Sequence, residues 1–479
     1  MLFANYINGE WIQSSDTFEN RNPANTDEVV GLFAKGKASD VEDAASAAAA
    51  ALPAWSKLPG PARGAYLYKV ADILDQRFEQ VAADMTREEG KTLPEAKGEV
   101  RRSINIFRYF AGEGSRMFGH LVPSERDRVH MFAVRKPIGV VGLVTPWNFP
   151  SAIPAWKLAP ALIAGNTVVM KPASAAPLSA WRLIEACHEA GIPKGVVNFV
   201  AGSGGTLGNA LVNAAPLKGI SFTGSCEIGH WLHEQASKRR LRIQLEMGGK
   251  NPTIVLADCD FNSAVENTVN AAMFSTGQKC TATSRAIVED AIYDRFVDAL
   301  VERTKKLKVG NGMEAGVDIG PAVDAGQLET DLKYIEIGKK ECGAPRCGGN
   351  RLTGGAYDKG YFVEPTIFAD VTQVMTIARE EIFGPVLAVM RAKNWEDALR
   401  IANDIPLGLS ASIQTTNVSR VFEFVYGMEA GLLTVNLPSA GVEYQLPFGG
   451  TKDSSFGPKE QGPAALDFYS DYKTVYLKY

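Results

Sequence analysis

The chain has no long apolar run and no excess of charge of one sign. Of its 479 residues, 46% are hydrophobic, and 50 Lys plus Arg face 54 Asp plus Glu, which gives a net charge of −4. No apolar run reaches the roughly 18 to 20 residues that cross a bilayer. The charge balance offers no basic surface for nucleic acid and no polybasic patch for a membrane. We therefore expect a globular protein of two or three domains whose partners include neither nucleic acid nor membrane.

Cysteine and histidine are scarce, and neither shows the spacing of a metal site. The chain has six Cys and five His. Cys342 and Cys347 lie close together in a Gly-rich segment without a second pair or a His cluster, so we predict no metal. The first ten residues lack the charged and apolar regions of a signal peptide. We therefore expect a cytoplasmic protein with reduced thiols.

Short apolar runs alternate with helical patterns through much of the chain. Residues 39–115 are Ala-rich in part and predict helices. Strands are predicted at 138–144, 167–170, 196–200 and 219–223, with helices between them at 156–164, 178–190, 207–213 and 229–240. The alternation resumes at 254–256, 285–288 and 386–390, and residues 468–479 have the pattern of a strand. Buried strands separated by helices indicate two α/β domains with parallel sheets.

Three segments could together provide covalent chemistry on a carbonyl. Cys280 lies among small and polar residues in Ser275–Arg285, which predicts an accessible thiol. Glu246 is followed by Met247 and two glycines, and Asn148 lies between two prolines in Thr145–Pro150. A thiol nucleophile, a carboxylate base and an amide donor for an oxyanion are the groups that such chemistry needs. Each taken alone is more often a structural residue.

These three segments, with Glu380–Val386 and Pro447–Lys452, resemble the motifs of the NAD(P)-dependent aldehyde dehydrogenase superfamily in order and over the whole chain. The resemblance implies an α/β fold with a Rossmann-like parallel-sheet cofactor domain, a second α/β catalytic domain and a small β oligomerisation arm. The corresponding ranges are 1–118 and 138–248, then 249–448, and for the arm 119–137 and 463–479. It also implies a homodimer or homotetramer.

The resemblance places a dinucleotide at the ends of the first group of strands. Gly202–Gly208 is a weak phosphate-binding pattern by itself, but Phe222–Gly229 adds a second turn that opens a helix. Ser225 would contact the pyrophosphate, Glu381 would hold the ribose beside the nicotinamide, and Phe383 would flank that ring. The full set expected to bind cofactor is Val144, Thr145, Pro146, Trp147, Lys171, Ala173, Ser174, Gly204, Gly208, Phe222, Thr223, Gly224, Ser225, Met247, Gly248, Glu381 and Phe383.

Lys171 and Ser174 bear on the choice of cofactor. By resemblance, Lys171 bonds the adenosine ribose, and relatives that prefer NAD often carry Glu where this chain has Ser174. A small neutral side chain would not repel a 2′-phosphate, and Lys171 could pair with it. We expect NADP to be preferred and NAD also to be accepted. Ser174 could instead, or in addition, be a helix N-cap.

The resemblance also implies the catalytic roles. Cys280 would attack an aldehyde and form a thiohemiacetal and then a thioester, Asn148 would hold the oxyanion, and Glu246 would activate water. A Glu at position 246 favours hydrolysis over acyl transfer to coenzyme A. Lys157 would join a proton relay, or alternatively form a structural ion pair.

The substrate is expected to be a small aldehyde. Arg102 lies at the edge of a semi-apolar helix face and could bind a distal carboxylate, or could be a solvated surface group. Phe149 and Ser439 are expected to line the same pocket. In its overall sequence, the chain most resembles bacterial 2,5-dioxopentanoate dehydrogenases. The alternatives are a succinate-semialdehyde dehydrogenase, a broad-specificity aldehyde dehydrogenase and, remotely, a non-catalytic structural protein on this scaffold.

Overall fold

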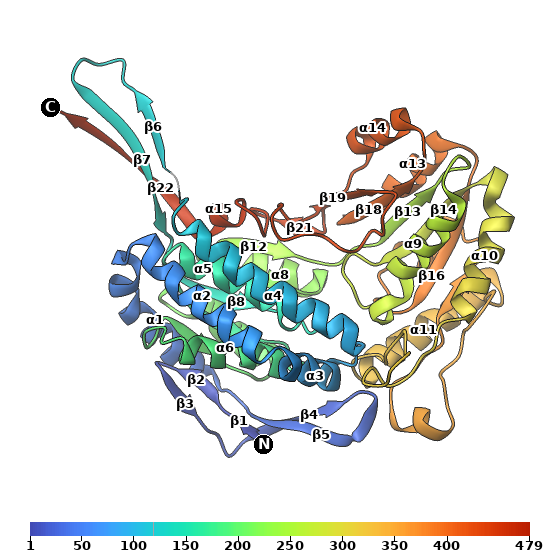
Figure 1. Ribbon diagram of the computed structural model, residues 1–479, viewed down its shortest axis with the longest axis horizontal. Helices are drawn as coiled ribbons and strands as arrows, with labels where there is room; N and C mark the ends of the chain where they lie inside the picture. The colour runs from blue at the N-terminus through green and yellow to red at the C-terminus, as the bar shows by residue number, and fades with distance from the viewer. Residues whose placement is uncertain (118) are drawn as a thin grey trace.

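The computed structural model describes residues 1–117 and 119–479, which form two α/β units and a projecting arm (Figure 1). Residue 118, at the end of the predicted range 1–118, lies outside the described residues. None of the helices in the described ranges is long and apolar enough to cross a membrane.

The first unit is built on an eight-stranded sheet. Its five central strands are parallel, and three further strands add antiparallel edges. The order across the sheet is β21 (Ser455–Phe456), β12 (Arg242–Glu246), β11 (Leu217–Thr223), β8 (Val140–Val144), β9 (Thr167–Lys171), β10 (Val197–Phe199), β2 (Asn5–Ile7) and β3 (Glu10–Ile12). The central strands are buried on both faces, which explains their continuous apolar sequences.

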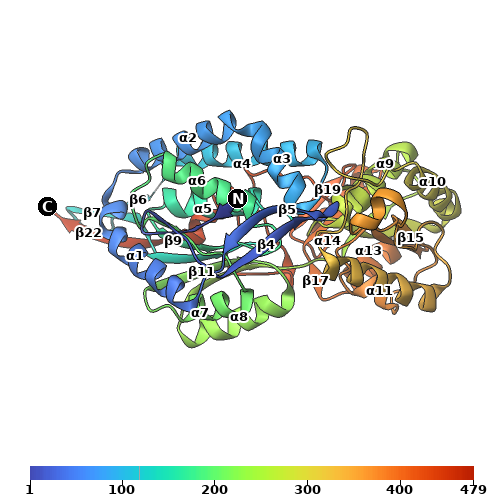
Figure 2. The same cartoon turned by 90° about the horizontal axis from the view of Figure 1, so that it is seen from below.

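Helices cover both faces of this sheet (Figure 2). One face carries α1 (Ala38–Lys57), α7 (Gly204–Asn213) and α8 (Cys226–Lys238). The other carries α2 (Gly60–Gln76), α3 (Phe78–Glu89), α4 (Leu93–Glu113), α5 (Ala152–Ile163) and α6 (Leu178–Glu189). A separate N-terminal sheet, in the order β1 (Leu2–Phe3), β5 (Asn25–Ala34) and β4 (Thr17–Asn22), packs below α6.

The second unit has a six-stranded sheet that is parallel throughout. Its order is β15 (Thr366–Phe368), β16 (Val386–Ala392), β14 (Thr283–Glu289), β13 (Asn251–Val255), β18 (Ser410–Gln414) and β19 (Leu432–Val435). One core includes α9 (Phe261–Met273) and α10 (Tyr293–Lys305), and the other α11 (Ala325–Cys342), α12 (Thr376–Arg379), α13 (Trp395–Asn403) and α14 (Val418–Gly427). The short antiparallel pair of β17 (Leu407–Gly408) and β20 (Thr451–Lys452) joins the segment before β18 to the segment after β19.

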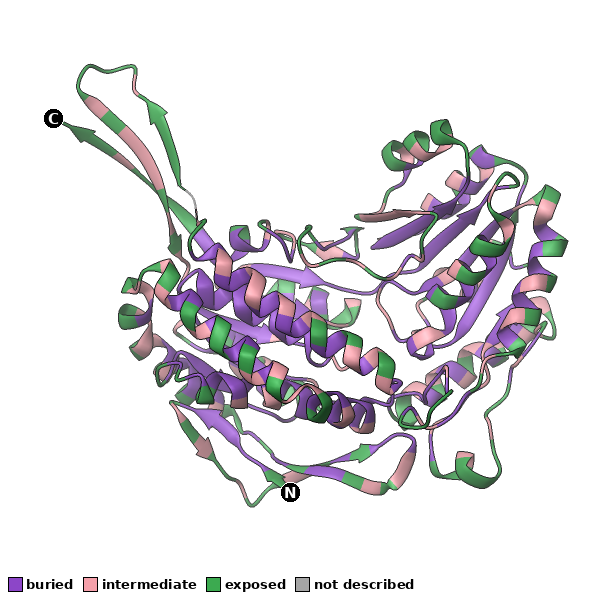
Figure 3. Cartoon of the chain, viewed as in Figure 1, coloured by how far each residue is buried: buried purple, intermediate pink, exposed green. Residues whose placement is uncertain are grey.

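The arm is a three-stranded antiparallel sheet that extends away from the first unit, and Figure 3 shows it as largely exposed. It contains β6 (His120–Pro123), β7 (Val129–Pro137) and β22 (Ser470–Lys478). The predicted C-terminal strand therefore begins two residues late, because Phe468 and Tyr469 end the short helix α15 (Ala465–Tyr469) and are buried in the core.

The predicted α/β class with parallel sheets is confirmed. The predicted helices and strands of both units are present, with ends that shift by a few residues. The register places Val144, Thr223 and Glu246 at the carboxyl ends of adjacent strands, where ligands bind in doubly wound sheets.

Candidate active site

Cys280 is half-buried and lines two cavities. One cavity has a volume of about 410 Å³ and also contains Arg102, Phe149 and Lys279 in its wall. The other, of about 230 Å³, is lined by Asn148, Glu381 and Phe383 among others. The thiol can therefore be reached from two cavities, in keeping with the accessible thiol that the sequence predicts. Two cavities at one thiol suit a reaction between two bound molecules.

A tight turn presents Cys280 between the two cavities. After α9 ends, Ser275, Thr276 and Gly277 have φ angles of 54°, 57° and 67°, all in the left-handed region. Two consecutive non-glycine residues in this region are uncommon and store backbone strain, which often marks a functional site. A side chain on Gly277 would meet the carbonyl oxygen of Gly384, so glycine is required there.

The surroundings of Cys280 favour the protonated thiol over the thiolate. Burial, together with the carboxylates of Glu381 and Glu246, raises the pKa of Cys280 to about 12, although backbone N–H groups partly oppose the shift. A thiol in this state needs a base, or a change in its surroundings when ligands bind, before it can act as a nucleophile.

Asn148 lies beside the thiol and is held from both ends. Its Nδ2 donates to the carbonyl oxygen of Gln278 at 3.0 Å, and its own backbone carbonyl accepts from Lys91 at 2.8 Å. A side-chain amide has two N–H groups. One is used on Gln278, and the second can donate to an oxyanion in the cavity that Asn148 and Cys280 share.

Glu246 is buried at the end of β12, and Ser455 donates a hydrogen bond to it. Burial, and then the like charge of Glu460, raise the pKa of Glu246 well above its ordinary value. A carboxyl group with a raised pKa is a stronger base and suits proton abstraction near neutral pH.

Lys157 is fully buried and forms an ion pair with Glu460, while its Nζ also donates to Ser221 at 2.8 Å. The predicted alternative of an ion pair is therefore present, and its partner lies next to the candidate base. Sequence analysis did not identify Glu460. The pair joins residues 303 positions apart, so no local pattern could have indicated it.

A larger cavity of about 600 Å³ shares its wall with the 230 Å³ cavity through Pro146, Trp147 and the turn at Thr223–Ser225. Nearly all the residues expected to bind cofactor line one or both of these cavities. They are Val144, Thr145, Pro146, Trp147, Lys171, Ala173, Gly204, Gly208, Phe222, Thr223, Gly224, Ser225, Met247, Gly248, Glu381 and Phe383. Glu227, Ile228 and Trp231 also line the larger cavity and were not predicted.

The residues of these cavities fit a dinucleotide. A Cβ atom on Gly204 or Gly208 would meet only open space, so the start of α7 leaves room for a ligand. The hydroxyls of Thr145 and Thr223 are buried and have no hydrogen-bond partner among the described residues. Ser225 caps the N-terminus of α8, where backbone N–H groups favour an anion.

Ser174 is exposed, and its hydroxyl donates to the carbonyl oxygen of Gly202 at 2.8 Å. The alternative that Ser174 is a helix N-cap is wrong, because α6 begins at Leu178 after Pro177. The nearby Lys171 is buried, its Nζ donates to the Pro172 carbonyl, and burial lowers its pKa to about 8.

Glu381 and Phe383 lie on the loop before β16. Glu381 accepts a hydrogen bond from the Gly249 N–H at 3.0 Å, and burial raises its pKa to about 7. Phe383 has a φ of 63° and packs edge to face against Trp147 at 5.3 Å between ring centroids. The loop therefore brings both side chains to the cavity that ends at Cys280.

Two cationic side chains without an ion pair among the described residues, Arg102 and Lys279, line the 410 Å³ cavity. Arg102 lies over the Trp156 ring at 5.5 Å and makes one hydrogen bond, at 3.2 Å, to Gln461. Lys279 donates a long hydrogen bond of 3.4 Å to the Asn270 carbonyl, and burial lowers its pKa to about 8. The carboxylates in the wall, Glu95 and Glu99, are already bonded to other groups.

Phe149 lines this cavity as expected, but Ser439 does not occupy the predicted place. Ser439 is fully buried, and its hydroxyl donates to the carbonyl oxygen of Thr281 at 2.7 Å. The wall is formed by the next residues, Ala440, Gly441 and Val442. Ser439 therefore stabilises the loop that carries Cys280 and does not line the cavity.

The cavities that fit a dinucleotide meet the 410 Å³ cavity at one thiol, that of Cys280. Together with the two α/β units, this arrangement defines a nicotinamide-dependent oxidoreductase with a cysteine in its site. A family model described as the aldehyde dehydrogenase family matches residues 11–475. The chain belongs to the aldehyde dehydrogenase family, and the predicted resemblance is confirmed.

Curated relatives cover almost the whole chain. It is 50% identical over 478 residues to alpha-ketoglutaric semialdehyde dehydrogenase of Bacillus subtilis (99% of this chain, 98% of the relative). It is 44% identical to 2,5-dioxopentanoate dehydrogenase of Saccharolobus solfataricus (98% of each). The structure is similar to betaine aldehyde dehydrogenase of Staphylococcus aureus in complex with NAD+ (TM-score 0.96, 33% identity, 99% of this chain and 94% of that chain). The NAD+ complex of an aldehyde dehydrogenase from Bacillus cereus gives a TM-score of 0.96 at 35% identity (100% and 97%).

Proposed function

We propose that this enzyme oxidises a short aldehyde that carries a distal carboxylate, with 2,5-dioxopentanoate as the substrate and 2-oxoglutarate as the product. The observation that carries this proposal is the pair of cations, Arg102 and Lys279, in the wall of the cavity that ends at Cys280. Neither makes an ion pair among the described residues, whereas the carboxylates beside them are engaged elsewhere. An anionic substrate would complete the charge balance of this cavity.

Two relatives support this choice. The names of the enzymes from Bacillus subtilis and Saccharolobus solfataricus both denote oxidation of this semialdehyde, and the chain shares 50% and 44% of its residues with them. Succinic semialdehyde is the second candidate, because the same two cations could bind the carboxylate of this shorter molecule.

The proposed reaction begins at the Cys280 sulfur. The thiol loses its proton to solvent when bound ligands change its surroundings, and the thiolate attacks the aldehyde carbon. The resulting oxyanion accepts hydrogen bonds from the free N–H of the Asn148 side chain and from the Cys280 backbone. When the carbonyl reforms, hydride leaves and a thioester remains on Cys280. Glu246 then takes a proton from a water molecule, whose oxygen adds to the thioester carbon. The adduct collapses to the free acid and the Cys280 thiolate, and the proton on Glu246 passes to the Lys157–Glu460 pair.

A bound nicotinamide would supply the acceptor for the hydride. The residues that would hold it are the lining residues given above, with Glu381 at the ribose and Phe383 at the ring. We propose NADP as the preferred cofactor, because Ser174 is small and neutral and Lys171 is buried with no carboxylate partner in the part of the chain that the structure describes. NAD would also be accepted.

We further propose the domain division given by the resemblance, and assembly into a homodimer or homotetramer. The arm strand β22 is a sheet edge, and the arm exposes Leu121, Tyr472, Tyr476 and Leu477. An exposed edge with apolar side chains is a common site of association between chains.

Initial rates of nicotinamide reduction test the proposal. The assay compares 2,5-dioxopentanoate and succinic semialdehyde with butanal and benzaldehyde, each with NADP and with NAD. The proposal expects kcat/KM at least about tenfold higher for the two acids, which corresponds to ~1.4 kcal/mol. Equal or faster oxidation of the neutral aldehydes would contradict it.

A further inference from the structure

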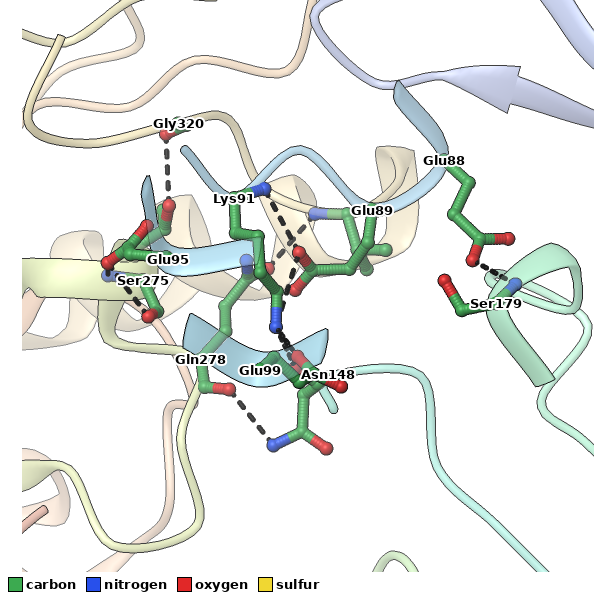
Figure 4. Close-up of polar contacts among 12 residues, drawn as sticks. Glu88, Glu89, Lys91, Glu95, Glu99, Asn148, Ser179, Ser275, Gln278 and Gly320 are labelled. Carbon is green, nitrogen blue, oxygen red and sulfur yellow. Dashed lines mark hydrogen bonds and ion pairs between the residues drawn. The ribbon is translucent and has the colours of Figure 1, made fainter. Parts of the chain in front are cut away.

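A group of buried charges lies at the turn between α3 and α4, next to the active site (Figure 4). Glu89, Lys91, Glu95 and Glu99 all come from eleven consecutive residues, and three of them, Glu89, Lys91 and Glu99, are at most 4% exposed. Buried charges are costly unless they are paired and hydrogen-bonded. The reaction proposed above uses none of them, so their retention needs another explanation.

Lys91 and Glu99 hold the segment that carries Asn148. Lys91 pairs with Glu99, and its Nζ donates to the Asn148 backbone carbonyl at 2.8 Å. The other oxygen of Glu99 accepts from the N–H groups of Ser151 and Ala152, at 2.9 and 3.0 Å. These bonds fix the backbone on both sides of Phe149, and the Lys91 ammonium also lies 4.4 Å from the centre of that ring.

Glu95 holds the strained turn before Cys280. One carboxylate oxygen accepts from the Ser275 N–H at 2.7 Å and from its hydroxyl at 3.0 Å. The other oxygen accepts from the N–H and the hydroxyl of Thr92 at the start of α4. Glu95 thus connects the helix start in the first unit to a left-handed residue in the second.

We propose that Lys91, Glu95 and Glu99 are positioning residues that set the distance between the Cys280 thiol and the Asn148 amide. All three lie on the first turns of one rigid helix or just before it, and each bonds to backbone atoms within five residues of a reacting group. Gln278 completes the connection, because its carbonyl accepts from Asn148. Displacement of a reacting group by about 1 Å can cost about 10² in rate.

The same segment offers a matched control. Glu88 is also fully buried, but its carboxylate accepts from the N–H groups of Leu178 and Ser179 at the start of α6 (Figure 4). Neither Glu88 nor these two partners line the cavities that contain Cys280. Glu88→Gln therefore disturbs a buried carboxylate without touching the site.

The inference rests on the proposed roles of Cys280 and Asn148, so the experiment includes Cys280→Ala and Asn148→Ala. If either of these retains wild-type kcat, the proposed function fails, irrespective of the positioning residues. One test variant is Glu95→Gln, which can place an NH2 group opposite the N–H groups of Ser275 or Thr92. The other is the double variant Lys91→Met/Glu99→Gln, which removes both charges of the Lys91–Glu99 ion pair at once. Ser275→Ala serves as a milder third variant should the others fold poorly.

Three quantities are measured on folded protein: kcat and KM for the aldehyde, KM for the nicotinamide cofactor, and the rate of hydrolysis of an activated aryl ester. The ester needs the thiol and the oxyanion donor but no hydride acceptor. We expect Glu95→Gln and the double variant to lose about 10-fold to 10²-fold in kcat for aldehyde and ester alike, with the cofactor KM unchanged. Glu88→Gln is expected to lower Tm and keep kcat within twofold of wild type. The inference is overturned if the test variants behave like this control, or if only the cofactor KM changes.

Discussion

Replacing Arg102 with Met should weaken the use of acidic aldehydes selectively. Arg102 lies in the wall of the 410 Å³ cavity with a single hydrogen bond, to Gln461, and its buried Nε has no partner among the described residues. It therefore has donors to spare for a carboxylate. Methionine keeps much of the apolar stem and the contact with Trp156, but removes the charge.

The expected magnitude follows from one charge-assisted contact. Such a hydrogen bond contributes about 1.5–3 kcal/mol, which corresponds to a loss of roughly 10-fold to 150-fold in kcat/KM. Because the carboxylate is distant from the aldehyde carbon, most of the loss should appear in KM. Lys279 remains in the cavity and should retain part of the discrimination.

The assay compares kcat/KM for 2,5-dioxopentanoate and for butanal in wild type, Arg102→Met and the control Arg101→Met. Arg101 is the preceding residue on α4, but it is exposed and pairs with Asp75 at 2.8 Å. The account predicts a large loss for the acid with Arg102→Met only. Equal losses for both aldehydes, or the same selective loss with Arg101→Met, would refute the assignment of Arg102 as the anchor.

Three further substitutions test other parts of the site. Glu460→Gln removes the like charge that raises the pKa of Glu246, so the base form should persist to lower pH and the acid limb of the kcat profile should move down; an unchanged or upward-shifted limb would contradict this. Ser174→Glu introduces a carboxylate near Lys171 and should shift the ratio of kcat/KM for NADP over NAD at least about tenfold toward NAD, which rates with both cofactors would reveal; an unchanged ratio would exclude this side chain from cofactor choice. Asn148→Ala should lower kcat about 10²–10³-fold with little change in cofactor KM, and a loss confined to KM would mean that its amide holds substrate instead of the oxyanion.

The sequence predicted those parts of the site that depend on contiguous motifs. Cys280, Asn148 and the turns at Gly204 and Ser225 are each marked by several neighbouring residues, and they line two cavities that share a wall. Glu246 is marked in the same way and ends the strand next to Thr223, but it is not among the lining residues of these cavities. The strands were predicted because burial on both faces gives them continuous apolar sequences.

The sequence could not predict what depends on contacts between distant segments. The Lys157–Glu460 pair spans 303 residues and the Glu95–Ser275 contact spans 180, so neither leaves a local pattern. Ser439 was expected in the cavity wall, but the wall begins at the next residue, Ala440. The side chain of Ser439 instead bonds to Thr281 and Thr283, and the sequence does not reveal such contacts in a loop. The left-handed turn at Ser275 was also missed, since two non-glycine residues give no signal for a positive φ.

The most direct test of the central claim is to trap the acyl group on the enzyme. The variant Glu246→Gln is mixed with NADP and 2,5-dioxopentanoate, nicotinamide reduction is followed rapidly, and the protein is then digested and analysed by mass spectrometry. The account predicts a burst of about one equivalent of reduced cofactor and an acyl group on the peptide that contains Cys280. Steady reduction without a burst, or an acyl group on another residue, would contradict covalent catalysis at Cys280.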